Sequence, residues 1–228
     1  MTFVSAVMPT TAARSKYVAK SVQCFLKQTF HDVELVVLSD TFSASLAAIV
    51  DVNPRIRYVY GPLPDCALWE TIGGKRNAIN SMAGGRIIVN WDDDDWYAPD
   101  RIADQVGLLI SSGKQVVGYH SMLYYRERDG GTFRYKYRGG GNYASGATQC
   151  YWKEYWAANP YPLMTIGEDS SFSMTAESKK CLVSTEGRGM IVVRAHGANT
   201  GKPSLGSHDF PAVPRTEFPQ EFFEAERE

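Results

Sequence analysis

Short apolar runs alternate with stretches of helical periodicity over the first half of the chain. Residues 3–8 and 33–39 are apolar runs of strand length, whereas apolar positions recur every three to four residues over 15–30. The first pattern is typical of buried strands and the second of an amphipathic helix. The same alternation predicts a helix over 43–50, a strand over 55–60, a helix over 75–82 behind Gly73-Gly74, a strand over 86–91, and a helix that opens at Pro99 and ends before Gly113.

This alternation predicts an α/β fold with a mostly parallel central sheet flanked by helices. Sheets of this kind bind ligands at the carboxyl ends of their strands. Asp40 directly follows the predicted strand over 33–39, and Asp92 to Asp95 follow the predicted strand over 86–91. We therefore expect these carboxylates to lie at one binding edge of the sheet.

The second half of the chain has a different pattern. Aromatic and charged residues surround Asp129-Gly130-Gly131, which is typical of a hairpin turn between two antiparallel strands. Strands are also predicted over 147–152 and 190–194, and a helix over 168–177.

Composition narrows the class of protein. The 228 residues carry a formal net charge of −1, which indicates no general attraction to nucleic acid or to an anionic membrane. No stretch is long and apolar enough to predict a membrane span, and the four cysteines lack the spacing of a zinc site or a disulfide framework. We expect a cytoplasmic protein with a single domain over residues 1–200 and, because four prolines follow Gly201, a tail or lid over residues 201–228.

Four consecutive aspartates, Asp92 to Asp95, are the most unusual local feature. Two carboxylates about 6 Å apart repel by roughly 3 kcal/mol at an effective dielectric of about 20. The flanking Trp91, Trp96 and Tyr97 indicate apolar surroundings in which an unpaired charge is costly. An acidic loop in solvent is the simplest alternative. A divalent cation would balance the charge, since oxygen ligands suit Mg²⁺ or Mn²⁺ and substrate phosphates commonly complete the shell.

The spacing excludes two other kinds of acidic site. An EF-hand that began at Asp92 would need glycine and glutamate where the chain has Tyr97 and Ala103. A phosphotransferase of the DxDxT type would need threonine or valine where the chain has Trp96 or Tyr97.

A locally extended segment would give the aspartates two roles. Asp92 and Asp94 would point to one side of the chain, and Asp93 and Asp95 to the other. One pair would then face a ligand, and the other would cap the helix that starts near Pro99.

The chain resembles the family 2 glycosyltransferases of GT-A fold in four ordered segments, VSAVMPTTAAR, VELVVLSD, GGKRNAINSMAGGRIIVNWDDDDWYAPDRI and IGEDSSF. The similarity covers roughly residues 3–175. It implies a Rossmann-like fold with a nucleotide-sugar-binding half over 1–113 and an acceptor-side half over 114–200. It also implies a metal-dependent inverting hexosyltransferase that moves a sugar from a nucleoside-diphosphate sugar, in our interpretation a UDP-sugar, to an acceptor hydroxyl by single displacement.

The resemblance implies roles for individual residues on the donor side. The first strand ends beside the nucleotide, Asp40 contacts the base, Arg76 lies near the base or the diphosphate, and Asp92 touches the ribose. A salt-bridge or packing role for Arg76 is the alternative. The complete set expected to bind the donor is Pro9, Thr10, Thr11, Asp40, Lys75, Arg76, Asp92, Asp93, Asp94 and Lys202, the last in a glycine-rich segment, HGANTGKPS, that would close as a lid.

The resemblance also implies a metal site and a catalytic base. Asp94, Asp95 and the late histidine His196 would bind Mn²⁺ or Mg²⁺, although a purely structural role for His196 is an equal alternative. The Glu168-Asp169 pair opens a predicted helix, and one of its carboxylates would be the general base. We favour Asp169, with stabilisation of the helix N-terminus as the alternative.

The acceptor side is less defined by the sequence. Aromatic faces stack on sugars or bases, and cationic side chains bind anions. The predicted hairpin around Asp129-Gly130-Gly131 carries both kinds of side chain and would contact the acceptor. The alternative is that its charges only protect an exposed edge of the sheet from aggregation. The acceptor would be a glycan, a lipid-linked glycan or a modified nucleotide in nucleic acid, and the residues expected to contact it are Trp96, Tyr97, Arg134, Lys136 and Gly146.

Two other classes of function fit the same residues. A nucleotidyltransferase or pyrophosphatase would use an acidic metal site without sugar transfer. A nucleotide-sugar-binding protein would have no turnover, so replacement of Asp169 would leave its behaviour unchanged.

Overall fold

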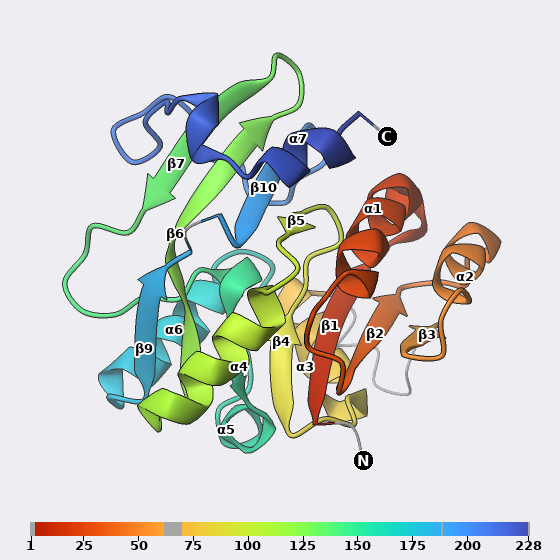
Figure 1. The fold of residues 1–228 in the computed structure, drawn as a ribbon. Coiled ribbons are helices and arrows are strands. Elements are labelled where there is room, and N and C mark those ends of the chain that lie inside the picture. The colour runs from red at the N-terminus through yellow and green to blue at the C-terminus, as the bar shows by residue number, and fades with distance from the viewer. Residues whose placement is uncertain (1–2, 62–69, 188, 228) are drawn as a thin grey trace.

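The computed structural model of the chain describes residues 3–61, 70–187 and 189–227. Cys66 therefore lies outside the described residues, and the thiols of Cys24, Cys150 and Cys181 are free. One ten-stranded sheet runs through the described part of the chain, with helices on both of its faces (Figure 1).

The strands of this sheet are β1 (Val4–Thr10), β2 (Val33–Ser39), β3 (Ile56–Tyr60), β4 (Ile87–Asn90), β5 (Trp96–Tyr97), β6 (Val116–Arg126), β7 (Gly131–Lys136), β8 (Cys150–Trp152), β9 (Leu182–Glu186) and β10 (Ile191–Ala195). Their order across the sheet is β3-β2-β1-β4-β8-β6-β10-β5, and β7 and β9 also pair with β6.

One strand of opposite direction separates the two halves of the sheet. β3, β2, β1 and β4 run parallel, with Val4 of β1 opposite both Val33 and Ile87. β8 is antiparallel to β4 and to β6, whereas β9 and β10 lie parallel to β6. The predicted parallel arrangement is confirmed for the first half. The complete sheet is mixed because β8 between the halves, β7 beside β6 and β5 beside β10 run in the opposite direction.

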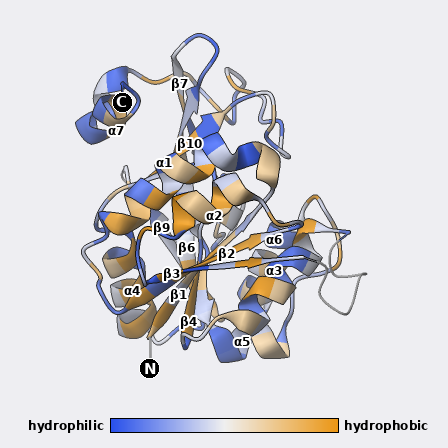
Figure 2. Ribbon diagram, turned by 90° about the vertical axis from the view of Figure 1, so that its right-hand side faces the viewer, coloured by the Kyte–Doolittle hydropathy of each residue, from blue (hydrophilic) through white to orange (hydrophobic). Residues whose placement is uncertain are grey.

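Helices cover the sheet on both faces, and they are α1 (Ser15–Leu26), α2 (Ala44–Val50), α3 (Ile72–Met82), α4 (Arg101–Ser112), α5 (Lys153–Ala158), α6 (Glu168–Ser178) and α7 (Gln220–Ala225). α1, α2 and α4 pack with Ala6 and Met8 in one apolar cluster, and α3, α5 and α6 pack with Val7 in another. Side chains that alternate along β1 thus belong to two core layers. Apolar residues are concentrated in the central strands between these helices (Figure 2).

Local sequence signals explain where several helices begin and end. Ser43 caps α2 by accepting a hydrogen bond from a backbone N–H three residues later, at 3.3 Å. Gly113 ends α4 with a φ of 64°. α3 begins at Ile72, so Gly73 lies inside its first turn and not before the helix as predicted. A Cβ on Gly73 would lie 1.9 Å from the carbonyl oxygen of Pro162, so a glycine is required by close packing.

The predicted hairpin is confirmed, since β6 and β7 pair antiparallel on either side of the turn at 127–130. β5, β9, α5 and α7 are not among the predicted elements. The C-terminal residues expected to form a tail or lid end in α7, which lies beside β10 (Figure 1). The buried rings of Phe222 in this helix and of Phe218 just before it pack on the core. Each helix of the described residues is too short or too polar to cross a bilayer.

Candidate active site

A cavity of about 820 Å³ opens at the carboxyl ends of β1 and β4. The loop after β4, the first turns of α3 and α6 and the segment after β10 complete its wall. This is the edge at which a parallel sheet binds ligands. Of the residues predicted for the site, those that line the cavity are Pro9, Thr10, Thr11, Lys75, Arg76, Asp92, Asp93, Asp94, Asp95, Gly146, Glu168, Asp169 and Lys202.

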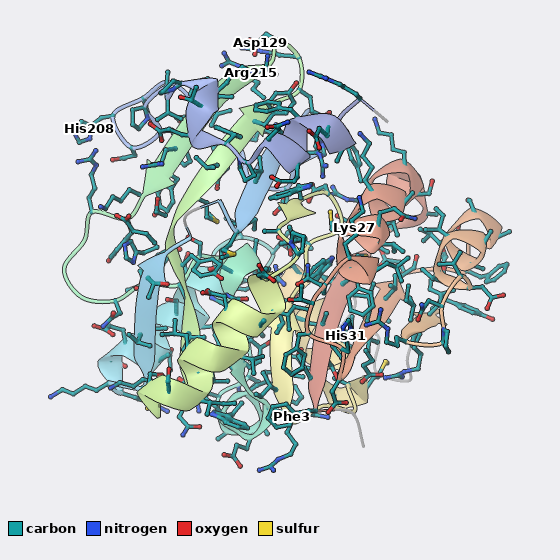
Figure 3. The ribbon with its side chains drawn as sticks, viewed as in Figure 1. Phe3, Lys27, His31, Asp129, His208 and Arg215 are labelled. Carbon is teal, nitrogen blue, oxygen red and sulfur yellow. The ribbon has the colours of Figure 1, made fainter. Side chains whose placement is uncertain are left out.

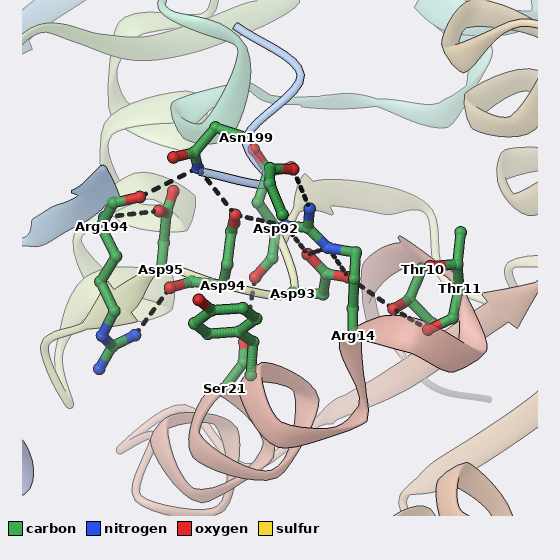
Figure 4. A network of polar contacts seen from close by, with 12 residues as sticks. Thr10, Thr11, Arg14, Ser21, Asp92, Asp93, Asp94, Asp95, Arg194 and Asn199 are labelled. Atoms are coloured by element: carbon green, nitrogen blue, oxygen red, sulfur yellow. Dashed lines mark hydrogen bonds and ion pairs between the residues drawn. The ribbon is translucent and has the colours of Figure 1, made fainter. Parts of the chain in front are cut away.

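The loop formed by Asp92 to Asp95 after β4, here called the acidic loop, is bent at Asp93 and Asp94. Both side chains contact Arg14, whose Nε donates to Asp93 Oδ2 at 2.8 Å and whose second terminal nitrogen, Nη2, pairs with Asp94 Oδ2 (Figure 4). The expected alternation of the four carboxylates is therefore wrong, because the bend brings neighbours to one guanidinium.

Asp93 is buried and held on two sides. Its Oδ2 accepts a hydrogen bond from Thr10 Oγ1 at 2.5 Å, in addition to the contacts with Arg14. Burial raises the pKa of Asp93 to about 6, although the hydrogen bonds from Arg14 and Thr10 act in the opposite direction. Asp93 thus links the end of β1 to the acidic loop.

Asp94 is the meeting point of several polar groups. Its Oδ2 lies 3.0 Å from His196 Nε2 and 3.0 Å from Asn199 Nδ2, besides the contact with Arg14. Burial acts to raise the pKa of Asp94, but the hydrogen bond from His196 and the charge of Arg14 outweigh it and hold the pKa below its usual value. Tyr17 stacks on the imidazole of His196, with ring centroids 4.2 Å apart.

Asp95 points into the protein beside β10. Its Oδ1 accepts a hydrogen bond from the Arg194 backbone N–H at 3.2 Å, and burial together with the charge of Asp94 raises its pKa well above the usual range. The expectation that an aspartate of the run caps α4 is wrong, because the N-cap residue is Asp100 and makes no side-chain cap.

A buried arginine joins the acidic loop to the start of α6. Arg76 donates from Nε to Glu168 Oε1 at 3.3 Å and from Nη2 to Asp92 Oδ1 at 3.4 Å. Burial raises the pKa of Glu168, and the charge of Arg76 offsets part of this effect. The remaining terminal nitrogen of Arg76, Nη1, is buried and has no hydrogen-bond partner within the described residues.

Asp169 is differently placed from its neighbour Glu168. Its Oδ1 accepts a hydrogen bond from the Ser170 backbone N–H at 2.7 Å, and its carboxylate lies against Gly146, where a Cβ would be 2.1 Å from Oδ2. The Asp169 side chain therefore reaches its position only because residue 146 is glycine. Asp169 lines the cavity and, unlike Glu168, makes no ion pair among the described residues.

Two predicted donor residues pair with each other at the edge of the cavity. Lys75 Nζ lies 2.7 Å from Asp40 Oδ1 and 2.9 Å from Oδ2. Lys75 lines the cavity, and Asp40, at the end of β2, is half-exposed beside it.

Four residues predicted to bind the acceptor are not brought to the cavity. Trp96 and Tyr97 are 5% and 1% exposed and pack in the core, so the expectation that their rings contact an acceptor is corrected: β5 pairs with β10 and turns both inward. Arg134 and Lys136 of β7 form ion pairs with Glu217 and Glu186. An acceptor role for these two cations stays a prediction.

Arg14 and Asn199 are site residues that the sequence did not predict. Arg14 follows the motif at the end of the first strand, and Asn199 lies in the glycine-rich segment after His196. The sequence did hold a signal for Arg14. This arginine follows the end of the first strand, and the four aspartates follow the end of another strand of the same sheet. Of the histidines outside the site, His208 lies at the periphery of the molecule (Figure 3).

The residues present fit a divalent cation that is held partly by substrate. Within the described residues, no group of three or more His, Cys, Asp or Glu side chains is arranged to hold a metal ion. The 3.0 Å approach of His196 Nε2 to Asp94 Oδ2 offers two ligand atoms. Mg²⁺ and similar ions commonly bind through one or two protein ligands and substrate phosphates, so a two-residue site suffices.

Comparison with known proteins identifies the family and the fold of the chain. The model of Glycosyl transferase family 2 matches residues 5–166. Residues 1–349 of TarS from S. aureus, in complex with UDP-GlcNAc, superpose with a TM-score of 0.67 at 16% identity, over 87% of this chain and 60% of that one. The mannosyltransferase PcManGT from Pyrobaculum calidifontis, in complex with GDP-Man and Mn²⁺, gives a TM-score of 0.64 at 15% identity, over 84% and 56%.

The chain spans only part of these relatives, and 37% of a longer TarS structure. The structural similarities establish the GT-A fold, which the sequence had implied. The family model covers well over half of the chain, from within β1 to just before α6. The chain therefore belongs to glycosyl transferase family 2.

Proposed function

We propose that this chain is a metal-dependent inverting glycosyltransferase that transfers a sugar from a UDP-sugar to an acceptor hydroxyl. The observation that carries the proposal is the position of Asp169, which shares one cavity with the basic residues Arg76, Lys75 and Lys202 and with the acidic loop. A base and an anion-binding wall on a single cavity suit a reaction in which a hydroxyl attacks and a diphosphate departs.

The basic wall of the cavity suits the diphosphate of the donor. Arg76 is 6% exposed, and its Nη1 is a buried donor without a partner in the described part of the chain. Buried donors usually have a hydrogen-bond partner, either a protein group or an ordered water. A phosphate oxygen would be such a partner, through a charge-assisted hydrogen bond. Thr10 and Thr11 would lie beside the nucleotide, with Asp40 at the base.

Asp94 and His196 would hold Mn²⁺ or Mg²⁺, and a role for Asp95 as a third ligand stays a prediction because its Oδ1 is bound to the Arg194 backbone. When bound, such an ion neutralises the charge that develops on the departing nucleoside diphosphate. The acidic loop is anchored for this purpose, since Asp93 is fixed to Thr10 and the backbone of Asp94 to Arg194. The Mn²⁺ in the PcManGT complex supports the same requirement here.

Asp169 would act as the general base. Its carboxylate removes the proton of the acceptor hydroxyl while that oxygen bonds to the anomeric carbon, and the bond to the diphosphate breaks on the opposite face. Glu168 is less suited to this step because its carboxylate is buried and paired with Arg76. Single displacement of this kind inverts the anomeric configuration.

The acceptor would approach past Gly146 and the first turn of α6, where Asp169 lies. A glycan, a lipid-linked glycan or a modified nucleotide in nucleic acid remain the proposed acceptors. Arg134 and Lys136 would contact only an acceptor large enough to extend from the cavity to the hairpin.

Calorimetric titration with nucleoside diphosphates and nucleotide sugars, in Mn²⁺, Mg²⁺ or EDTA, tests the proposal. We expect one diphosphate family to bind to wild type only with metal, and Asp94→Ala to weaken this binding by about tenfold or more. Lys27→Ala, at the far end of α1, is the matched surface control (Figure 3).

Incubation of the same donors with metal separates the rival functions. Release of nucleoside monophosphate would favour a nucleotidyltransferase or pyrophosphatase, and binding without any turnover would favour a binding protein. An anomeric NMR signal of retained configuration in the transfer product would contradict single displacement.

A further inference from the structure

Arg14, which follows β1 in the chain, contacts the two central aspartates of the acidic loop. Its Nε lies 2.9 and 2.8 Å from the two carboxylate oxygens of Asp93, and its Nη2 contacts Asp93 Oδ1 at 2.7 Å and also Asp94 Oδ2. The third nitrogen, Nη1, donates to the carbonyl oxygen of Ala198 at 2.9 Å. One guanidinium therefore joins both aspartates to the segment that follows β10.

The two carboxylates do not share Arg14 equally. Asp93 receives three contacts from the guanidinium and is also fixed by Thr10. Asp94 receives a single contact, and at the same oxygen that faces His196 Nε2 and Asn199 Nδ2. A carboxylate oxygen has two lone pairs, so three donors on Asp94 Oδ2 are more than it can satisfy well. Loss of this single contact would leave Arg14 Nε on Asp93 and would relieve the crowding at Asp94 Oδ2.

Asp94 Oδ2 is also the oxygen that lies closest to His196 Nε2, at 3.0 Å. A divalent ion bound to Asp94 Oδ2 would need a lone pair of the oxygen that Arg14 now contacts. Two cations on the same oxygen repel strongly in a site of low dielectric. Arg14 and the ion therefore compete for the same oxygen.

We propose that Arg14 is an exchangeable counter-cation, which neutralises Asp93 and Asp94 in the ion-free protein and moves from Asp94 to the diphosphate of the donor when a divalent ion binds. The inference rests on the proposed function. Arg14 lines the cavity, and Nε can stay on Asp93 while the two terminal nitrogens leave Ala198 and Asp94 for phosphate oxygens. The planar guanidinium matches phosphate oxygens in geometry as well as in charge.

Manganese binding in the absence of nucleotide tests the first half of this proposal. Free Mn²⁺ is measured by electron paramagnetic resonance during titration of wild type, Arg14→Gln and Arg14→Lys. We expect Arg14→Gln to bind Mn²⁺ about tenfold more tightly, because no resident charge is displaced, and Arg14→Lys to stay within about threefold of wild type. Lys27→Gln, which loses the same charge at the exposed C-terminal end of α1, should leave the affinity unchanged.

Unchanged or weaker Mn²⁺ binding in folded Arg14→Gln would overturn the exchange, because Arg14 would then be a purely structural partner of the acidic loop. Circular dichroism melting of each variant establishes that it is folded. If Arg14→Gln does not fold, Arg14→Lys decides, since an affinity at least tenfold below wild type would equally overturn the proposal.

Nucleotide binding tests the second half. At saturating Mn²⁺, we expect Arg14→Gln to bind UDP about tenfold more weakly than wild type, and equal affinity would overturn the transfer of Arg14 to the diphosphate. The proposed function fails separately: if no variant, wild type included, binds any nucleoside diphosphate while Arg14→Gln still binds Mn²⁺ more tightly, the exchange at Asp94 stands and the donor site does not.

Discussion

The carboxylate of Glu226 accepts two hydrogen bonds from the guanidinium of Arg194, at 2.9 Å from Nε and 2.6 Å from Nη2. The remaining nitrogen of this guanidinium donates to the backbone carbonyl of Asp94 at 2.8 Å, and the Arg194 backbone N–H donates to Asp95. Arg194 is 1% exposed. The residue after α7 thus helps to position the acidic loop, although it lies more than a hundred residues away in the chain.

Replacement of Glu226 by alanine should destabilise the protein and loosen the acidic loop. Arg194 would remain buried with an uncompensated charge, so we expect a loss of about 2–4 kcal/mol in the free energy of unfolding. Urea denaturation measures this loss, and the affinity for Mn²⁺ should fall with it. Glu221→Ala removes an exposed carboxylate from α7 and should change stability by less than about 0.5 kcal/mol. Equal effects of the two substitutions would contradict the anchoring role.

The close contact between Gly146 and Asp169 gives a second prediction. A methyl group at residue 146 would lie 2.1 Å from Asp169 Oδ2, so Gly146→Ala must displace the carboxylate. We expect kcat for sugar transfer to fall by about 10²-fold, with little change in the affinity for UDP, since a base misplaced by about 1 Å loses this much. Steady-state kinetics and calorimetry measure the two quantities.

Gly107 provides the control for this substitution. A Cβ there has no atom within 4 Å, and the residue lies in the middle of α4. Gly107→Ala should leave kcat unchanged and stabilise the helix by up to about 1 kcal/mol. A fall in kcat for Gly107→Ala as large as that for Gly146→Ala would show that the effect does not come from Asp169.

The sequence predicted which residue types line the cavity better than it predicted which side chains contact one another there. The carboxylates of Asp92 to Asp94 and of Asp169 follow strands or open a helix, and local pattern together with motif order placed them at one edge. Two of the partners of Asp94, Arg14 and Asn199, are 80 and 105 residues away from it in the chain. No local pattern reports which distant arginine or amide turns toward a carboxylate, so these contacts became visible only in the folded chain.

Trp96 and Tyr97 show why aromatic residues beside a site are ambiguous in sequence. Next to four aspartates, their rings resemble a sugar-binding platform. In the structure the two-residue strand β5 pairs with β10, Tyr97 packs at 4.0 Å centroid distance on Trp91, and Trp96 contacts Phe222 of α7. Neither β5 nor α7 was predicted, because strands of two residues and helices of six carry little periodicity.

Glu168 predicts a pH dependence of stability. Burial raises its pKa in the folded state above the value of an unfolded chain, even with Arg76 beside it. A raised carboxyl pKa means that the folded state binds the proton more tightly than the unfolded state. The resulting contribution to the free energy of unfolding is complete below the pKa of the unfolded state and is lost as the pH rises through the pKa of the folded state. Wild type should therefore lose stability relative to Glu168→Gln as the pH rises from about 4, near the ordinary carboxyl pKa, toward neutral pH.

Urea denaturation of both proteins across this pH range measures the difference, in EDTA so that no ion binds. Glu154→Gln, an exposed carboxylate in the first turn of α5, serves as the control and should parallel wild type at every pH. A difference between wild type and Glu168→Gln that grows more favourable to wild type with rising pH would show that the ion pair with Arg76 outweighs burial.

Asp169 and Glu168 separate the general base from its neighbour. Asp169→Asn retains the size of the side chain but cannot accept the acceptor proton, so we expect kcat to fall by about 10²–10⁴-fold. The affinity for UDP and Mn²⁺ should stay at the wild-type value, because Asp169 makes no ion pair with the basic residues of the cavity among the described contacts. Glu168→Gln should instead weaken UDP binding, because Arg76 would lose the charged partner that holds its guanidinium beside the cavity. The reverse assignment, a larger loss of kcat in Glu168→Gln with donor affinity intact, would make Glu168 the base and Asp169 a helix-terminal residue.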